Sequence, residues 1–189
     1  MGWRHTGLAC CAALICAAAP ATARAQDEGR FEVRNAYVEL AGDRWHLDVR
    51  LDLALAEAAQ QAFAGGVPLV LELEIEASVA RRFLPAEAVV EMTRRWELAY
   101  DAISQHYIVT DRESGEQVSH VSQQDALDAF ARLSGIVIAD TRTLPPDGRF
   151  GMRVRAMVEI GDLPAAIRIL LFWRSWSRST DWYEWSVRP

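Results

Sequence analysis

The alternation of apolar and polar residues is clearest in residues 66–82. Every odd position from Val67 to Val79 is valine, leucine, isoleucine or alanine, and the even positions include Glu72, Glu74 and Glu76. This period of two predicts a long strand with one buried and one solvent-exposed face. A strand of this length needs several neighbours, so we expect the rest of the chain to be arranged around it.

The flanking sequence supplies those neighbours. We predict six further strands, at residues 31–40, 45–55, 89–100, 106–110, 136–143 and 150–160. In the first of them the apolar residues change face near Asn35, which indicates a β-bulge. A turn at 41–43 makes the first two strands a hairpin, and Pro145–Gly148 is predicted to close a second hairpin between 136–143 and 150–160. Pro85 is predicted to break the chain before residue 89.

Helical patterns are short and few. We predict helices at 57–64, at 123–134 with Ser122 as its N-cap, and at 163–173 with Pro164 in the first turn. The fold class that follows is α+β. It is mostly antiparallel β, a sandwich-like or curved meander of about seven strands, with two or three short helices.

Residues 1–25 have the composition of a secretory signal peptide. Arg4 precedes a run of small and apolar residues at 8–19, and residues 23–25 read Ala-Arg-Ala, a cleavage site. The run is too short for a transmembrane anchor. A lipoprotein signal is the alternative, but Ile15 stands before Cys16, where a small residue is expected. We therefore expect cleavage near Ala25, a periplasmic protein, and one exported domain over residues 26–189.

Cleavage would change the chemistry that is available. All three cysteines lie before residue 26, so the exported domain would have no disulfide, thiol nucleophile or cysteine metal ligand. Loss of Arg4 and Arg24 leaves 18 basic residues against 26 acidic ones, a net charge of −8. So acidic a domain is a poor candidate for binding nucleic acid.

Four segments in order resemble an exported bacterial family catalogued as domain of unknown function 4390. They are Gly66–Leu69, Leu98–Asp101 with Gln105–Tyr107, Asp125–Leu127, and Leu163–Arg168 with Ser179 and Trp182. Ile167 stands where the family pattern has leucine. The resemblance implies an exported proteobacterial protein with no established activity. Family members are often encoded near a sensor histidine kinase of the nitrogen-regulation type, which implies an envelope-signalling partner.

The glutamate row at positions 72, 74 and 76 admits three interpretations. Alternate carboxylates on a strand lie about 6.6 Å apart, a spacing that suits an inverting glycosidase. They could also contribute to a calcium site. The third interpretation is a solvated sheet face with ion pairs to the outward-facing Arg50, Arg153 and Arg155, and we favour it.

Other chemistry-bearing residues are sparse. The histidines that remain, His46, His106 and His120, lack metal-ligand spacing. No nucleophile elbow, zinc-protease, phosphate-loop or dinucleotide motif occurs, so we expect no enzyme activity and no cofactor.

The C-terminal tail carries the best functional signal. Its candidate partner or lipid contacts are Trp173, Trp176, Trp182, Trp185, Arg168 and Arg174. Tryptophan and arginine are enriched in binding hot spots, and tryptophan is enriched at membrane interfaces. The alternative is that the tail closes the core, and both hold if only some of the rings are buried. We therefore expect a non-enzymatic interaction module of the envelope, contacting a sensor kinase, another envelope protein or the membrane surface. The alternative function is a carrier of a small apolar ligand or lipid, held between the sheet and the final helix.

Overall fold

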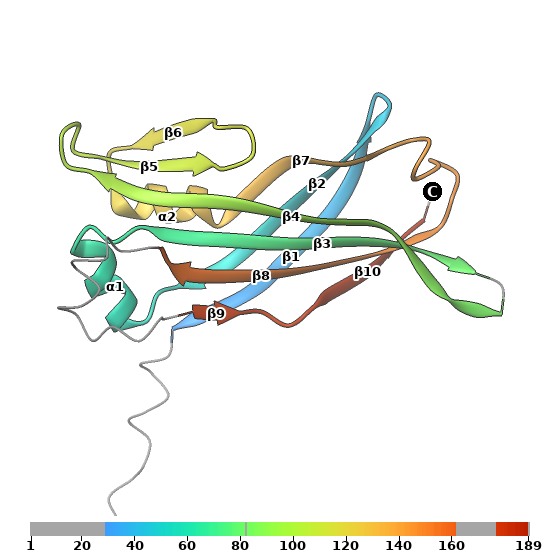
Figure 1. Cartoon of the computed structure of the whole chain (residues 1–189), viewed down its shortest axis with the longest axis horizontal. Helices are drawn as coiled ribbons and strands as arrows, with labels where there is room; N and C mark the ends of the chain where they lie inside the picture. Colours follow the sequence, from blue (N-terminus) through green and yellow to red (C-terminus); the bar gives the residue numbers. More distant parts are fainter. Residues whose placement is uncertain (1–28, 82, 162–176, 189) are drawn as a thin grey trace, which may run out of the picture.

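The computed structural model describes residues 29–81, 83–161 and 177–188. In these residues the chain forms ten strands and two short helices, and the strands make two antiparallel sheets that pack face to face (Figure 1). This confirms the predicted α+β class. The strands are β1 (Arg30–Ala41), β2 (Arg44–Ala54), β3 (Leu69–Arg81), β4 (Leu84–Asp101), β5 (His106–Asp111), β6 (Gln117–His120), β7 (Arg132–Asp140), β8 (Phe150–Ile160), β9 (Ser177–Ser179) and β10 (Tyr183–Val187). The helices are α1 (Glu57–Ala64) and α2 (Gln123–Phe130).

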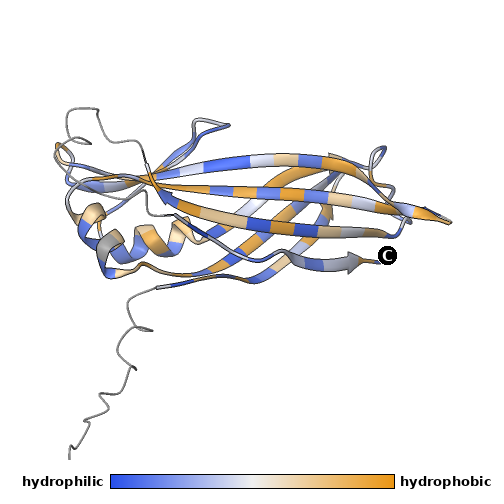
Figure 2. Ribbon diagram, turned by 60° about the horizontal axis from the view of Figure 1, so that its bottom comes forward, coloured by the Kyte–Doolittle hydropathy of each residue, from blue (hydrophilic) through white to orange (hydrophobic). Residues whose placement is uncertain are grey.

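The larger sheet is built around β3, as the alternation predicts. Its strand order is β10-β8-β3-β4-β5-β6, and β9 pairs with β8 beyond the end of β10. The odd positions of β3 are buried from Leu69 to Ala77, whereas the glutamates between them are partly exposed. The same alternation of colours runs along β3, β4 and β8 in Figure 2.

The smaller sheet has the order β1-β2-β7 and packs against the inner face of the larger one. The bulge predicted near Asn35 is confirmed, because Val33 pairs with Leu51 and Asn35 pairs with Arg50, leaving Arg34 as the extra residue. The bulge restores Ala36 and Val38 to the inner face of β1 after Phe31 and Val33.

The core lies between the two sheets, and both helices cover one end of it (Figure 1). Predicted and observed bounds agree for α1, and Ser122 caps α2 by accepting a hydrogen bond from the Asp125 amide at 3.1 Å. None of the described helices is long and apolar enough to cross a bilayer.

The predicted second hairpin is wrong. β7 pairs with β2 in the smaller sheet, whereas β8 pairs with β3 in the larger one. The connection through 141–149 therefore carries the chain from one layer to the other. Trp45 fixes it by donating its indole N–H to the Leu144 carbonyl oxygen at 2.6 Å and packing edge-on against Phe150, with ring centroids 5.2 Å apart.

Two further boundaries differ from the prediction. The second helix ends at Phe130 rather than near residue 134, and β7 begins at Arg132. Pro85 does not end a strand: β4 begins at Leu84, and Pro85 and Ala86 form a bulge between the pairs Arg81–Leu84 and Val79–Glu87. Proline is tolerated at bulges because no ladder hydrogen bond is required there.

Three short strands, β6, β9 and β10, add to the seven predicted. The predicted signal peptide at 1–25 and the predicted helix at 163–173 lie outside the described residues.

Candidate functional site

The solvent face of the larger sheet carries a ladder of ion pairs along β3. Each glutamate of the row binds an arginine that stands directly opposite on a neighbouring strand. The pairs are Glu72 with Arg95 (2.6 Å), Glu74 with Arg155 (2.7 Å) and Glu76 with Arg153 (2.5 Å). This confirms the interpretation as a charge-paired sheet face for Arg153 and Arg155. The predicted pairing of Arg50 with this row is wrong, because Arg50 lies on β2 in the smaller sheet.

The ladder explains the electrostatics of the arginines. The hydrogen bond and charge of Glu72 raise the pKa of Arg95, and the hydrogen bond from Arg153 to Glu76 raises the pKa of Arg153. The three glutamates are therefore partners of permanently charged groups, and a water between two of them would have to compete with guanidinium donors. The observed pairing is the one expected of a charge-paired sheet face.

Trp182 lies above this ladder. Its ring is 4.5 Å from the guanidinium carbon of Arg153 and 4.9 Å from that of Arg155, so one indole spans both cations. Because each guanidinium also binds a glutamate of β3, the ring rests on a platform of two ion pairs. The Trp182 side chain is only partly buried, which leaves part of the ring open to solvent.

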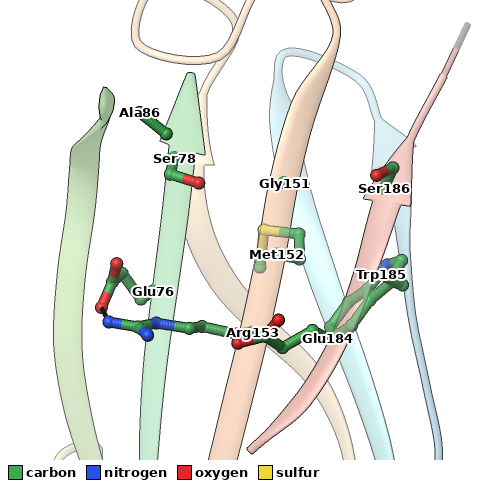
Figure 3. Close-up of a pocket in the computed structure, with 9 residues that line it drawn as sticks. All are labelled: Glu76, Ser78, Ala86, Gly151, Met152, Arg153, Glu184, Trp185 and Ser186. Carbon is green, nitrogen blue, oxygen red and sulfur yellow. Dashed lines mark hydrogen bonds and ion pairs between the residues drawn. The ribbon is translucent and has the colours of Figure 1, made fainter. Parts of the chain in front are cut away.

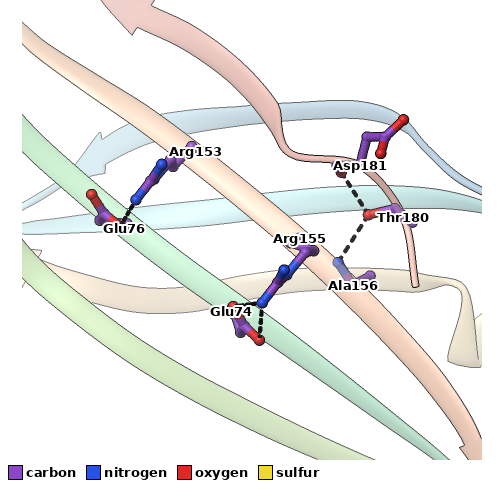
Figure 4. Close-up of polar contacts among 7 residues, drawn as sticks. All are labelled: Glu74, Glu76, Arg153, Arg155, Ala156, Thr180 and Asp181. Carbon is purple, nitrogen blue, oxygen red and sulfur yellow. Dashed lines mark hydrogen bonds and ion pairs between the residues drawn. The ribbon is translucent and has the colours of Figure 1, made fainter. Parts of the chain in front are cut away.

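Thr180 positions Trp182 by fixing the preceding segment on β8. Its backbone N–H donates to the Ala156 carbonyl oxygen at 2.9 Å, and its hydroxyl accepts from the Ala156 N–H at 3.1 Å. The hydroxyl also donates to the Asp181 carbonyl oxygen at 2.8 Å (Figure 4). Thr180 is buried, so these bonds are shielded from water and hold residues 180–182 against the sheet.

Trp185 on β10 faces the core, unlike Trp182. It stands opposite Met152 in the β10–β8 ladder, packs against Tyr183 with ring centroids 5.7 Å apart, and is partly buried against the core. The two described tail tryptophans therefore lie on opposite faces of the sheet, Trp182 on the outer face and Trp185 against the core. Four of the candidate contact residues lie outside the described residues: Trp173, Trp176, Arg168 and Arg174.

Two hollows flank the Arg153–Glu76 pair on this face. The first hollow, of about 510 Å³, is lined by residues of β3, β8 and β10 and by Ala86 at the start of β4. The second, of about 460 Å³, lies between β3, β4 and Trp182. Figure 3 shows the side chains of Glu76, Arg153 and Glu184 in line across three strands. On the β4 side, Glu91 stands opposite Glu76, so three carboxylates lie in one row with the guanidinium of Arg153, which binds Glu76, and the row is acidic.

Comparison with known proteins identifies the family of this chain. A family model described as a domain of unknown function (DUF4390) matches residues 28–186. The chain belongs to the DUF4390 family. No curated protein and no solved structure matches this DUF4390 protein.

A third cavity, of about 330 Å³, lies between the layers of this DUF4390 protein where β4, β5 and β6 face β7 and the end of α2. Its apolar wall consists of Trp96, Val109, Val118, Ala129 and Leu133, and its polar wall of Asp111, Glu116, His120, Arg132 and Ser134. The Nε2 atom of His120 is buried without a hydrogen-bond partner in the described part of the chain.

Asp111 on this polar wall is held ionised by its surroundings. Burial raises the pKa of Asp111, but hydrogen bonds from the amides of Ser114 and Glu113, together with the Arg94 guanidinium at 2.8 Å, outweigh it. The pKa of Asp111 therefore lies below its ordinary value. Since Arg94 binds this carboxylate, the charge of the pair is balanced within the wall.

The histidines do not converge. His46 on β2, His106 at the start of β5 and His120 at the end of β6 lie on separate strands. The described residues contain no group of three histidine, cysteine, aspartate or glutamate side chains placed to hold a metal ion.

Sequence reasoning missed two parts of this site. The stacking of Trp182 on two arginines depends on how the tail crosses β8, for which the sequence holds no local signal. Arg95 was available as a partner of Glu72, since the alternation of residues 89–100 places it on the solvent face of β4.

Proposed function

We propose that this DUF4390 protein is an exported, non-enzymatic interaction module of the bacterial envelope, and that the outer face of the larger sheet around Trp182 receives a partner protein. The observation that carries the proposal is the support of Trp182: a partly exposed indole held over two ion-paired arginines. The family resemblance suggests a membrane sensor kinase as the partner.

The stacking favours a binding role because it fixes the ring before a partner arrives. An aromatic side chain that is already held in one position loses little conformational entropy on binding. Tryptophan and arginine are also the residues most enriched among binding hot spots. Trp182 with Arg153 and Arg155 combines both types at the centre of one sheet face.

The surroundings of Trp182 favour a protein partner over a substrate. The two hollows lie on an open sheet face and are separated by the Arg153–Glu76 pair, so they do not form one enclosed pocket of the kind that small ligands require. The glutamates that could act as catalytic acids or bases are paired with arginines. The acidic row of Glu91, Glu76 and Glu184 favours a partner with basic side chains at this point.

Crosslinking in living cells tests the proposal. A photoreactive residue replaces Ser186, which is exposed beside the first hollow, and a second strain carries it at Tyr37, which is 51% exposed on β1 of the smaller sheet. We expect one envelope protein in the products from position 186 and not from position 37. Introducing Trp182→Ala into the protein that carries the photoreactive residue at position 186 should remove that product, while the circular dichroism spectrum stays unchanged.

Three results would contradict the interaction module. The same products at both positions would mean nonspecific contact. Lipid products alone from position 186 would replace the protein partner by a membrane. Unfolding of the Trp182→Ala variant would assign the ring to the stability of the fold.

Export is the second part of the proposal, and the N-terminal sequence supports it. The periplasmic form of the protein should begin at Gln26, which mass spectrometry of the intact protein measures directly. A protein that retains residue 1 and stays with the cytoplasm would overturn periplasmic localisation.

The inter-layer cavity favours a second candidate, a carrier of a small apolar ligand. Its volume of about 330 Å³ lies at the lower end of the range for ligand pockets, and half of its lining side chains are apolar. Native mass spectrometry of protein isolated from the periplasm should then show an added mass, and Ala129→Phe should displace it by filling the cavity. Apo protein alone in the parent sample would dismiss the carrier.

A further inference from the structure

The hairpin between β3 and β4 extends past the rest of the larger sheet. The last β3–β8 pair is Val79–Phe150, but β3 and β4 continue to the pair Arg81–Leu84 beyond it. In Figure 1 this tip reaches farther along the long axis than the other drawn parts of the sandwich. It is a narrow, convex projection of two strands.

The tip carries its apolar side chains outward. Phe83 is 90% exposed and Leu84 is 62% exposed, and the tip is coloured as hydrophobic in Figure 2. Phe83 has a φ of 64°, a conformation that bulky residues rarely adopt. A strained, exposed phenylalanine adds little to the core, and residues of this kind concentrate at functional sites.

Arginines surround this tip. Phe150 pairs with Val79 on β3 and with Val187 on β10, so Arg149, just before β8, and Arg188, just after β10, lie at the level where the tip begins. Both are exposed, and neither forms an ion pair within the described residues.

The acidic residues of this end are fewer than the basic ones. Arg81 pairs with Glu87, and Asp147 lies in the loop that precedes Arg149. The sequence places Arg82 directly before Phe83. The tip is therefore locally basic in a chain whose net charge is −6.

We propose that the β3–β4 tip inserts Phe83 and Leu84 into the surface of an anionic lipid bilayer, while Arg81, Arg149 and Arg188 contact the lipid headgroups. An apolar pair flanked by arginines is the arrangement that holds peripheral proteins at a membrane surface. A stable protein partner would need about 800 Å² of contact on each side, which a two-residue tip does not offer. A bilayer accepts a narrow convex wedge without a matching groove. This surface is separate from the face around Trp182 and does not depend on the proposed function.

Sedimentation with vesicles tests the tip. The protein is used as cells produce it, with its N-terminus determined by mass spectrometry, on phosphatidylcholine vesicles with and without phosphatidylglycerol. Phe83→Asn removes the ring and keeps a residue that tolerates positive φ. The matched control is Ile103→Asn, because Ile103 is 97% exposed in the β4–β5 turn at the opposite end, beside Asp101 rather than an arginine.

We expect binding to vesicles that contain phosphatidylglycerol and weaker binding to phosphatidylcholine alone. Phe83→Asn should weaken binding about tenfold, which corresponds to the burial of one aromatic side chain. Arg149→Gln and Arg188→Gln should each weaken it about fivefold and reduce its salt dependence. Ile103→Asn should leave binding unchanged.

Several outcomes would overturn the lipid contact. One is equal binding to both vesicle types, and another is an equal loss in Phe83→Asn and Ile103→Asn. If no vesicle is bound while a photoreactive residue at position 83 captures a protein, the tip is a protein contact and the lipid proposal is wrong.

Discussion

Arg153 on β8 and Glu76 on β3 face each other across the larger sheet, with the Arg153 Nη2 atom 2.5 Å from a Glu76 carboxylate oxygen. The row continues to Glu91 on β4 and Glu184 on β10. Arg153 thus separates Glu76 from Glu184, and among the described residues it is the one arginine in this row. The two members of the pair are therefore unequal: the cation has two acidic neighbours, whereas the carboxylate has one basic neighbour and one acidic one.

This asymmetry predicts unequal effects of removing either partner. Arg153→Met should lower the free energy of unfolding by about 1 kcal/mol, because it removes the pair and leaves like charges on adjacent strands. Glu76→Gln should cost less, about 0.5 kcal/mol or below, since Arg153 still stands opposite the acidic Glu184 and the repulsion between Glu76 and Glu91 disappears. Urea unfolding measures both. Arg34→Met is the control, because Arg34 is exposed at the bulge of β1 and forms no ion pair in the described part of the chain. Equal losses for Arg153→Met and Glu76→Gln would refute the asymmetry.

Much of the larger sheet is predictable because its strands have one buried face. Leu69–Ala77 on β3 and Met152–Val158 on β8 alternate without interruption, and an unbroken period of two is sufficient to assign the faces of a strand. The faces of β7 cannot be assigned in the same way. Leu133 and Ile136 are both buried at odd spacing, because residues 134 and 135 form a bulge opposite β2. The interrupted period, together with Leu127 and Phe130, resembles a longer helix.

The crossover between the layers was not predictable from local patterns. Two alternating segments joined by a Pro-Pro-Asp-Gly sequence normally predict a hairpin. β7 and β8 pair instead with β2 and β3, and the loop between them bonds through Leu144 to Trp45, which lies 99 residues earlier in the chain. The pairing of Glu74 and Glu76 with Arg155 and Arg153 is non-local in the same way, whereas the charges on each strand face could be assigned from sequence.

The Trp45–Leu144 hydrogen bond makes a prediction about the crossover. Trp45→Phe keeps an aromatic ring but removes the donor, leaving the buried Leu144 carbonyl without that bond and a void beside Phe150. We expect a loss of about 2–3 kcal/mol in the free energy of unfolding. Tyr37→Phe, on the exposed face of β1, should change it by less than about 0.5 kcal/mol. Thermal and urea unfolding measure both variants. A Trp45→Phe variant as stable as the parent would mean that the crossover is held by other contacts.

Gly135 makes a prediction about the bulge in β7. It has a φ of +69°, its N–H donates to an Asp48 carboxylate oxygen at 3.1 Å, and a Cβ atom there would meet nothing within 4 Å. The cost of Gly135→Ala is therefore conformational alone, about 1 kcal/mol. Gly135→Asn should cost less, because asparagine adopts positive φ more readily. Urea unfolding that ranks asparagine below alanine in stability would contradict this account.

Asp140, at the end of β7, makes a prediction about acid stability. Hydrogen bonds from the Arg142 guanidinium and from the amide and hydroxyl of Thr143 lower the pKa of Asp140 from 3.8 to about 2. Because the pKa is lower in the folded state than in the unfolded chain, the carboxylate stabilises the fold above pH 3.8. That contribution is lost as the pH falls towards 2. Asp140→Asn should therefore lose less stability than the parent over this acidic range, although it is less stable at neutral pH.

Two measurements check the role of Asp140. Carbon-detected NMR should give a titration midpoint near 2 for its carboxyl group. Urea unfolding of the parent and of Asp140→Asn should give curves of stability against pH that converge as the pH approaches 2. Asp101 and Asp111, whose pKa values are also lowered, are present in both proteins and contribute equally to the two curves. Parallel curves would mean that Asp140 is not the acid-sensitive group at the start of the crossover, and that its bonds to Arg142 and Thr143 do not form in solution.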